Sequence, residues 1–140
     1  MPEGVGYGPQ FTASTGLTLN YVGRHVYAHS GNVLTIASLA FNDLLSFSTG
    51  TNYIVGNLVS YGATDKANPS QGAHSLTQIL FNGVSLGLIK LESGKEGMQA
   101  YANIPLLIPP HTEVVISVAA ESAGWNSSVS FEGKIYGKID

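Results

Sequence analysis

The last segment of the chain, from Val129 to Tyr136, alternates regularly between two kinds of side chain. One parity holds Val129, Phe131, Gly133 and Ile135, and the other holds Ser130, Glu132, Lys134 and Tyr136. Successive side chains of a β-strand point to opposite faces, so this pattern predicts a strand with one dry face and one outer face. A chain that repeats this pattern has to bury one face of each sheet against another layer.

Similar short segments recur along most of the sequence, separated by turn residues at roughly ten-residue spacing. In residues 24–30, His25, Tyr27 and His29 oppose Val26 and Ala28. Residues 33–47 form either two strands or one long bent strand. Further strands are expected over residues 52–61, 76–81, 84–91, 100–108, 112–118 and 129–136. With no long helical pattern, these segments predict an all-β fold: a single antiparallel β-sandwich, jelly-roll-like, of about eight strands.

The dipeptide Asn82-Gly83 is the clearest turn signal. A two-residue type I′ turn needs positive φ at both central residues, which Asn and Gly tolerate. The register that this turn implies makes one face of the hairpin almost wholly apolar. It pairs Phe81 with Val84, Ile79 with Leu86 and Thr77 with Leu88.

Three other positions carry specific structural expectations. Gly56 suggests a bulge within its strand, and Pro105 indicates an edge or bulged strand because proline has no backbone N–H to donate to a ladder. The segment Ala119–Ser128 is interpreted as a loop that carries the single tryptophan, Trp125.

The length of 140 residues suits one domain. Residues 1–20 are rich in Gly, Pro, Ser and Thr, with Tyr7 and Phe11 as isolated aromatic anchors, and are interpreted as an N-terminal arm. Residues 21–140 are expected to form the jelly-roll β-sandwich domain. Such an arm either lies on a neighbouring subunit or is an unstructured tail, and the sequence leaves both open.

Charged residues make up only 11% of the chain, and the net charge is −3. The six Lys and Arg residues are scattered, whereas nucleic-acid binding requires a clustered basic surface, so no nucleic-acid partner is expected. No apolar run approaches the ~20 residues of a membrane helix, and the first residues lack the pattern of a signal peptide. Low charge leaves little repulsion against self-association, although a monomer solubilised by Ser, Thr and Asn is the alternative.

No catalytic, cofactor-binding or metal site is predicted. The chain has no cysteine, which excludes disulfides, thiolate metal ligands and cysteine catalysis. His25 and His29 are separated by about 13 Å on a regular strand, too far to share one ion. The acidic residues are dispersed and give no carboxylate pair, so the chain is not expected to be an enzyme.

The aromatic residues support one ligand-binding hypothesis. Trp125, in a segment rich in Gly, Asn and Ser, is the best candidate for stacking against a sugar. The other members of such a platform are Tyr53, Tyr61, Tyr101 and Tyr136. The alternative is that the tyrosines cap the sandwich edges and Trp125 closes one end of the core.

Three segments together resemble a group of small jelly-roll virion proteins of tailed bacteriophages. Gly16–Ala28 contains the Tyr-Val-Gly…Tyr-Ala opening, Leu107–Val114 contains an Ile-Pro-Pro-x-Thr step, and Gly133–Gly137 closes with Gly-x-Ile-Tyr-Gly. The resemblance implies a non-enzymatic capsid part, commonly a decoration or cement protein that assembles as an oligomer on the shell. The shared motifs consist of turns and strand ends, so they transfer no functional residue.

The resemblance therefore implies a decoration or cement protein on the capsid surface of a virion, made in the host cytoplasm. Its expected partners are the major capsid protein or other virion proteins and its own copies, with a trimer as the expected oligomer. The expected interface residues are Tyr7, Phe11, His25, Tyr27 and His29. The outer face of the last strand is a further contact candidate. The alternative function is a carbohydrate- or receptor-binding module of the fibre-tip kind, with a glycan bound at Trp125.

Overall fold

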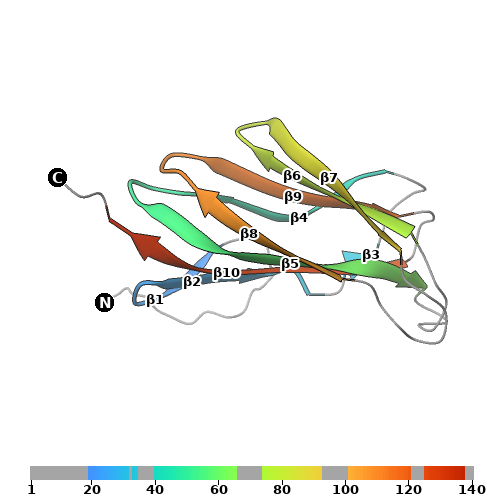
Figure 1. Ribbon diagram of the computed structural model, residues 1–140. Helices are drawn as coiled ribbons and strands as arrows, with labels where there is room; N and C mark the ends of the chain where they lie inside the picture. The colour runs from blue at the N-terminus through green and yellow to red at the C-terminus, as the bar shows by residue number, and fades with distance from the viewer. Residues whose placement is uncertain are drawn as a thin grey trace.

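The computed structural model describes residues 19–31, 33–34, 40–65, 74–92, 101–120 and 125–137, and only the backbone of Leu34, residues 63–65, His74, Glu92 and Trp125. These residues form ten β-strands (Figure 1). The strands are β1 (Asn20–Val22), β2 (His25–His29), β3 (Val33–Leu34), β4 (Asn42–Ser48), β5 (Tyr53–Asp65), β6 (His74–Phe81), β7 (Val84–Glu92), β8 (Tyr101–Ile108), β9 (Glu113–Ala120) and β10 (Trp125–Tyr136). Within these ranges, no helix is long and apolar enough to cross a membrane.

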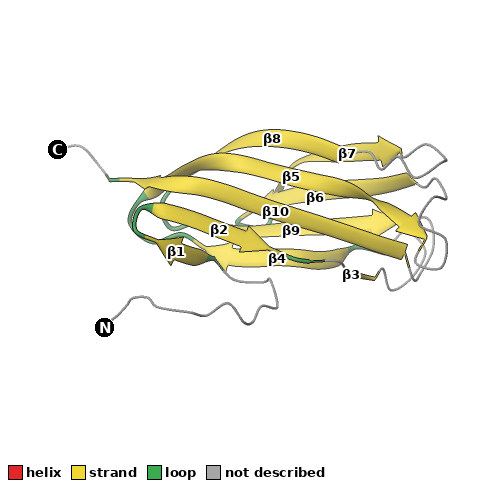
Figure 2. Cartoon of the chain, turned by 90° about the horizontal axis from the view of Figure 1, so that it is seen from below, coloured by secondary structure: helices red, strands yellow, loops and turns green. Residues whose placement is uncertain are grey.

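The strands form two antiparallel sheets stacked as two layers (Figure 2). One sheet has the order β1-β2-β10-β5-β8, with β3 also paired to β10, and the other has the order β4-β9-β6-β7. Leaving aside the short β1 and β3, a four-stranded sheet β2-β10-β5-β8 faces a four-stranded sheet β4-β9-β6-β7. This is the strand order of a jelly roll, so the predicted all-β jelly-roll sandwich of about eight main strands is confirmed.

The core lies between the two sheets and is built by the alternation that the sequence predicts. Val26 and Ala28 of β2 are buried, as are Val129 and Phe131 of β10. Phe131 meets Phe47 of β4 from the opposite sheet, with ring centroids 5.8 Å apart. Removing such side chains from water is the main stabilising contribution to a fold of this kind.

One buried polar contact joins the sheets inside this core. Ser60 of β5 and Thr77 of β6 are both fully buried, and their hydroxyl oxygens lie 2.7 Å apart. A buried hydroxyl without a hydrogen-bond partner is destabilising, and here each hydroxyl is the hydrogen-bond partner of the other.

The turn between β6 and β7 is as predicted, since Asn82 and Gly83 have φ angles of 52° and 81°. Phe81 pairs with Val84 beside this turn, as the sequence register requires.

The predicted register is wrong beyond the first pair of the β6–β7 hairpin. The ladder shifts between Ile79 and Leu80, so that Ile79 pairs with Gly87. β7 carries one extra residue here, and a slip of one residue moves side chains to the other face. As a consequence Leu86 and Leu88 lie outside, 54% and 56% exposed, instead of completing an apolar inner face.

Two further expectations about strand irregularity have different outcomes. The predicted bulge at Gly56 is wrong, because the β5–β10 ladder passes regularly through the pair Gly56–Gly133 and shifts only between Asn126 and Ser128. Pro105 lies in β8, which ends its sheet, as predicted. Its pairing opposite Asn57 causes no register shift in the β5–β8 ladder.

The sequence suggests that Ala119–Ser128 is a loop, but parts of this segment belong to strands. Ala119 and Ala120 end β9, and β10 already begins at Trp125, which pairs with Asp65 of β5. A composition rich in Gly, Ser and Asn is typical of a loop, but β10 begins within this segment because the long strand β5 pairs with it. Tyr7 and Phe11 lie outside the described residues, so the arm remains a prediction.

Candidate interaction surface

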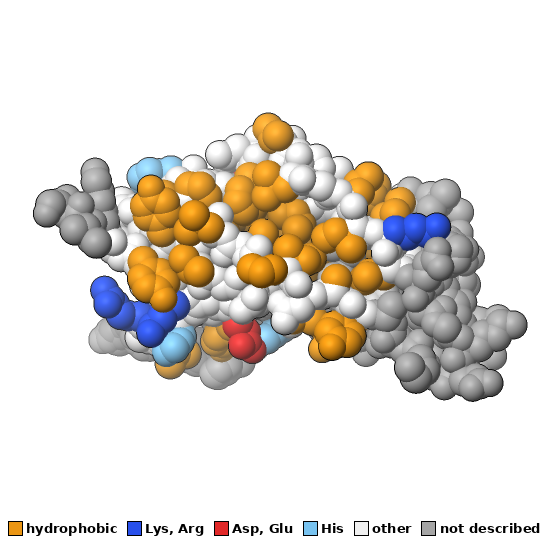
Figure 3. Space-filling model, viewed as in Figure 1, with side chains coloured by type: hydrophobic (Ala, Val, Ile, Leu, Met, Phe, Trp, Pro, Cys, Tyr) orange, Lys and Arg blue, Asp and Glu red, His pale blue; other side chains and the backbone are white. Residues whose placement is uncertain are grey.

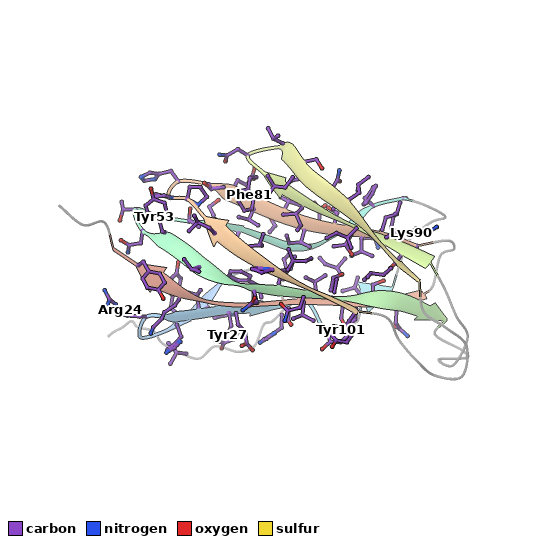
Figure 4. All side chains as sticks on the ribbon, in the orientation of Figure 1. Arg24, Tyr27, Tyr53, Phe81, Lys90 and Tyr101 are labelled. Atoms are coloured by element: carbon purple, nitrogen blue, oxygen red, sulfur yellow. The ribbon has the colours of Figure 1, made fainter. Side chains whose placement is uncertain are left out.

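The predicted interface residues of β2 lie together on its outer face. His25 and His29 are exposed and flank the half-buried Tyr27, whose side chain points away from the core (Figure 4). The rings of Tyr27 and His29 are 5.3 Å apart between centroids and tilted by 33°. The sequence therefore places these three side chains correctly, while their role at an interface remains a prediction.

These residues line a shallow, open hollow of ≈ 340 Å³. Val22 of β1 and Glu132 of β10 complete its sides, because β10 pairs with β2 so that Glu132 lies opposite Tyr27. Among the residues that the structure describes, no group of three or more His, Asp or Glu side chains is arranged to hold a metal ion. The hollow thus offers imidazole, phenol and carboxylate groups on an open surface.

A larger feature is the apolar outer face of β5 and β8, which we name the β5–β8 face. Six of the twelve exposed large hydrophobic side chains among the described residues belong to it, so exposed apolar surface is concentrated here. Its members are Tyr53, Val55 and Tyr61 of β5, Tyr101 and Leu107 of β8, and the neighbouring Tyr136 of β10.

Strand pairing brings the members of this face together. Tyr61 lies opposite Tyr101, with ring centroids 6.0 Å apart, and Val55 lies opposite Leu107. Tyr53 lies opposite Tyr136 at the other end of the sheet. Tyr53 and Tyr61 are eight positions apart on β5, about 26 Å along a strand, so the predicted aromatic platform is divided into two distant pairs.

The surface around the free edges of β8 and β7 is also nearly free of charge. Figure 3 shows hydrophobic side chains gathered over these strands, with charged side chains only towards the ends and the lower margin. Neither β8 nor residues 53–62 of β5 contain a charged residue. A second, smaller apolar group, the β7 patch, lies on the other sheet and consists of Val84, Leu86 and Leu88.

Pro105 determines how β8 can meet another molecule. The ladder with β5 continues past Pro105 without a shift, so the missing N–H of Pro105 belongs to the free edge of the sheet. A proline at this position interrupts the row of donors that an added strand would use. Contact with a partner therefore falls to the side chains of the face and not to the backbone edge.

The Ile-Pro-Pro-x-Thr motif has a structural role at one end of the sandwich. The Thr49 hydroxyl donates to the Pro109 carbonyl at 2.7 Å and accepts from the Thr112 backbone N–H at 2.9 Å. The Thr49 N–H donates to the Thr112 carbonyl at 2.9 Å. These bonds hold the β8–β9 turn against the end of β4, in agreement with a motif that specifies fold.

The remaining predicted site residue is Trp125. It occupies the first position of β10, and its side chain lies outside the described residues. The sequence pattern alone does not identify the β5–β8 face as a unit. The available signal is the uncharged segment Tyr101–Ile108, in which Asn103 is the only amide or hydroxyl side chain apart from that of Tyr101.

No family model matches the chain, and no curated protein matches it in sequence. Among solved structures it partly overlaps a chain of infectious bursal disease virus, Gx strain, with 14% identity and a TM-score of 0.45, covering 82% of this chain and 33% of that chain. The VP2 subviral particle of infectious bursal disease virus gives 16% identity and a TM-score of 0.43, with coverages of 84% and 34%. A GH26-CBM35 β-(1,4)-mannanase of Podospora anserina gives 7% identity and a TM-score of 0.37, with coverages of 80% and 26%. The chain thus spans about a third of the length of the two viral chains, and these overlaps assign no function.

Proposed function

We propose that this chain is a non-enzymatic virion structural protein that acts by burying its apolar surface against neighbouring proteins of the particle. The observation that carries the proposal is the β5–β8 face, where Val55, Tyr101 and Leu107 are 43%, 64% and 59% exposed. Exposed apolar side chains gathered on one face of a sheet indicate an interaction surface, and tyrosine is enriched at such surfaces.

The finer role is that of a decoration or cement protein of a phage head. The three sequence segments that resemble jelly-roll virion proteins support this role, and the observed strand order agrees with the fold that the resemblance implies. The β7 patch lies on the opposite sheet from the β5–β8 face. Two separate apolar surfaces suit a protein that contacts both its own copies and the major capsid protein.

The test is the composition of purified particles. Quantitative mass spectrometry should find the chain on the particles in a fixed ratio to the major capsid protein, and antibody labelling should locate it on the particle surface. A chain that is absent from purified particles, or present only in trace and variable amounts, contradicts the proposal.

A second candidate function is glycan or receptor binding, which the exposed pair Tyr61–Tyr101 favours. Adjacent exposed aromatic rings provide apolar faces on which sugar rings stack. The test is binding to a glycan array. Binding that is lost in Tyr101→Ala or in Trp125→Ala, the residue that the sequence suggests, supports this function. The same binding should be retained in Tyr136→Ala. A wild-type chain that binds no glycan on the array removes it.

A further inference from the structure

We propose that the partner of the β5–β8 face is a second copy of this chain, packed face to face about a two-fold axis. This inference rests on the proposed function, because it names the occupant of the surface that the function uses. It also replaces the trimer expected from the sequence with a dimer, since a face that meets itself closes a two-fold contact.

The size of the face suits a single copy of the chain as its partner. The six exposed side chains of the face present on the order of 600 Å² of surface, given the roughly 150–250 Å² that an aromatic side chain can bury. A standard interface buries roughly 800 Å² on each partner, including its polar rim. The face with its margin therefore approaches the area that one partner buries in a standard interface. One further copy of the same sheet can cover an area of this size.

The distribution of charge around the face suits a two-fold contact. The face carries no charge, but its β10 margin carries one base and one acid two residues apart, with Lys134 opposite Val55 and Glu132 opposite Asn57. In a two-fold contact, residue i meets j while j meets i. Lys134 of one copy can thus pair with Glu132 of the other, and the reverse, at the rim of an apolar centre.

The interrupted edge of β8 favours contact through the sheet face. Pro105 interrupts the donor row of β8, so a second copy cannot extend the sheet through this edge. Packing of two outer sheet faces requires no backbone donors and places two sheets about 10 Å apart. The paired residues Val55–Leu107 lie near the middle of such a contact.

The experiment is the mass of the full-length protein in solution, measured by sedimentation equilibrium and light scattering. We expect the wild type to have the mass of two chains and Leu107→Lys to have the mass of one. Phe41→Lys is the matched control, because Phe41 is 42% exposed and directly precedes β4 of the other sheet, outside the face and outside the hollow beside Tyr27. Val55→Lys tests the same contact from β5 and should behave like Leu107→Lys.

Charge reversal at the rim provides an independent readout. Lys134→Glu and Glu132→Lys should each weaken the dimer several-fold by opposing like charges, and the double reversal should restore it. A wild-type mass of one chain or of three chains overturns the inference, as does an unchanged dimer in folded Leu107→Lys. A monomer or trimer that is still found on particles overturns only this inference, whereas a dimer that is absent from particles overturns the proposed function.

Discussion

Gly56 of β5 and Gly133 of β10 lie opposite each other at the centre of one sheet, with their backbones in close approach. A Cβ atom added at Gly56 would overlap the Glu132 carbonyl oxygen and would lie 2.6 Å from the Gly133 Cα. A Cβ added at Gly133 would lie 2.9 Å from the Val55 carbonyl oxygen. Neither strand leaves room for a side chain here, and Gly133 also lines the hollow beside Tyr27.

Gly56→Ala should therefore lower the free energy of unfolding by about 3 kcal/mol or more, because the overlapping atoms are backbone and cannot move aside separately. The measurement is urea denaturation followed by circular dichroism. Gly87→Ala is the matched control, since a Cβ at Gly87 of β7 meets nothing within 4 Å. Equal stabilities of the two variants would contradict the close approach of β5 and β10.

The buried Ser60–Thr77 contact predicts strong coupling between the two sheets. Ser60→Ala leaves the Thr77 hydroxyl buried without a partner and should cost about 1–3 kcal/mol, and Thr77→Val should have a similar effect on Ser60. The double variant should be more stable than the sum of the two losses implies, by about 1 kcal/mol. Strictly additive losses in a thermal or urea unfolding cycle would show that the two hydroxyls do not interact.

Asn82 serves the β6–β7 turn in two ways that substitution can separate. Its φ is 52°, and its Oδ1 accepts a hydrogen bond of 2.8 Å from the Glu113 backbone N–H. Asn82→Ala loses both features and should cost about 1–2 kcal/mol, because alanine adopts positive φ poorly. Asn82→Gly keeps the conformation and should cost clearly less. The order of the two unfolding midpoints checks this prediction, and an inverted order would refute it.

The sequence predicts those parts of the fold that depend on local pattern. The alternation around Val26 and Phe131 correctly identifies buried and outer faces, and the Asn82-Gly83 turn requires only two residues with positive φ. The eight main strands follow from the same period. The outer-face placement of Tyr27 between two histidines is predictable for the same reason.

Features that depend on contacts between distant segments could not be predicted in this way. The extra residue of β7 does not change the alternation of side chains in the sequence, so this alternation alone places Leu86 on the wrong face. Gly56 is a glycine because β10 approaches it, and Gly133 is 77 positions away in the sequence. The β5–β8 face could not be predicted for the same reason. An apolar residue such as Leu107 is expected in the core unless the order of strands is known, and this order makes β8 an edge strand.

The most direct test of the central claim, that the β5–β8 face is an assembly surface of a particle, is the incorporation of face variants into virions. The measurement is the number of copies on purified particles when infected cells supply Leu107→Lys, Phe41→Lys or the wild-type chain at equal soluble levels. We expect Leu107→Lys to be depleted several-fold and Phe41→Lys to match the wild type. Leu107→Lys at wild-type copy number on the particles would contradict the claim.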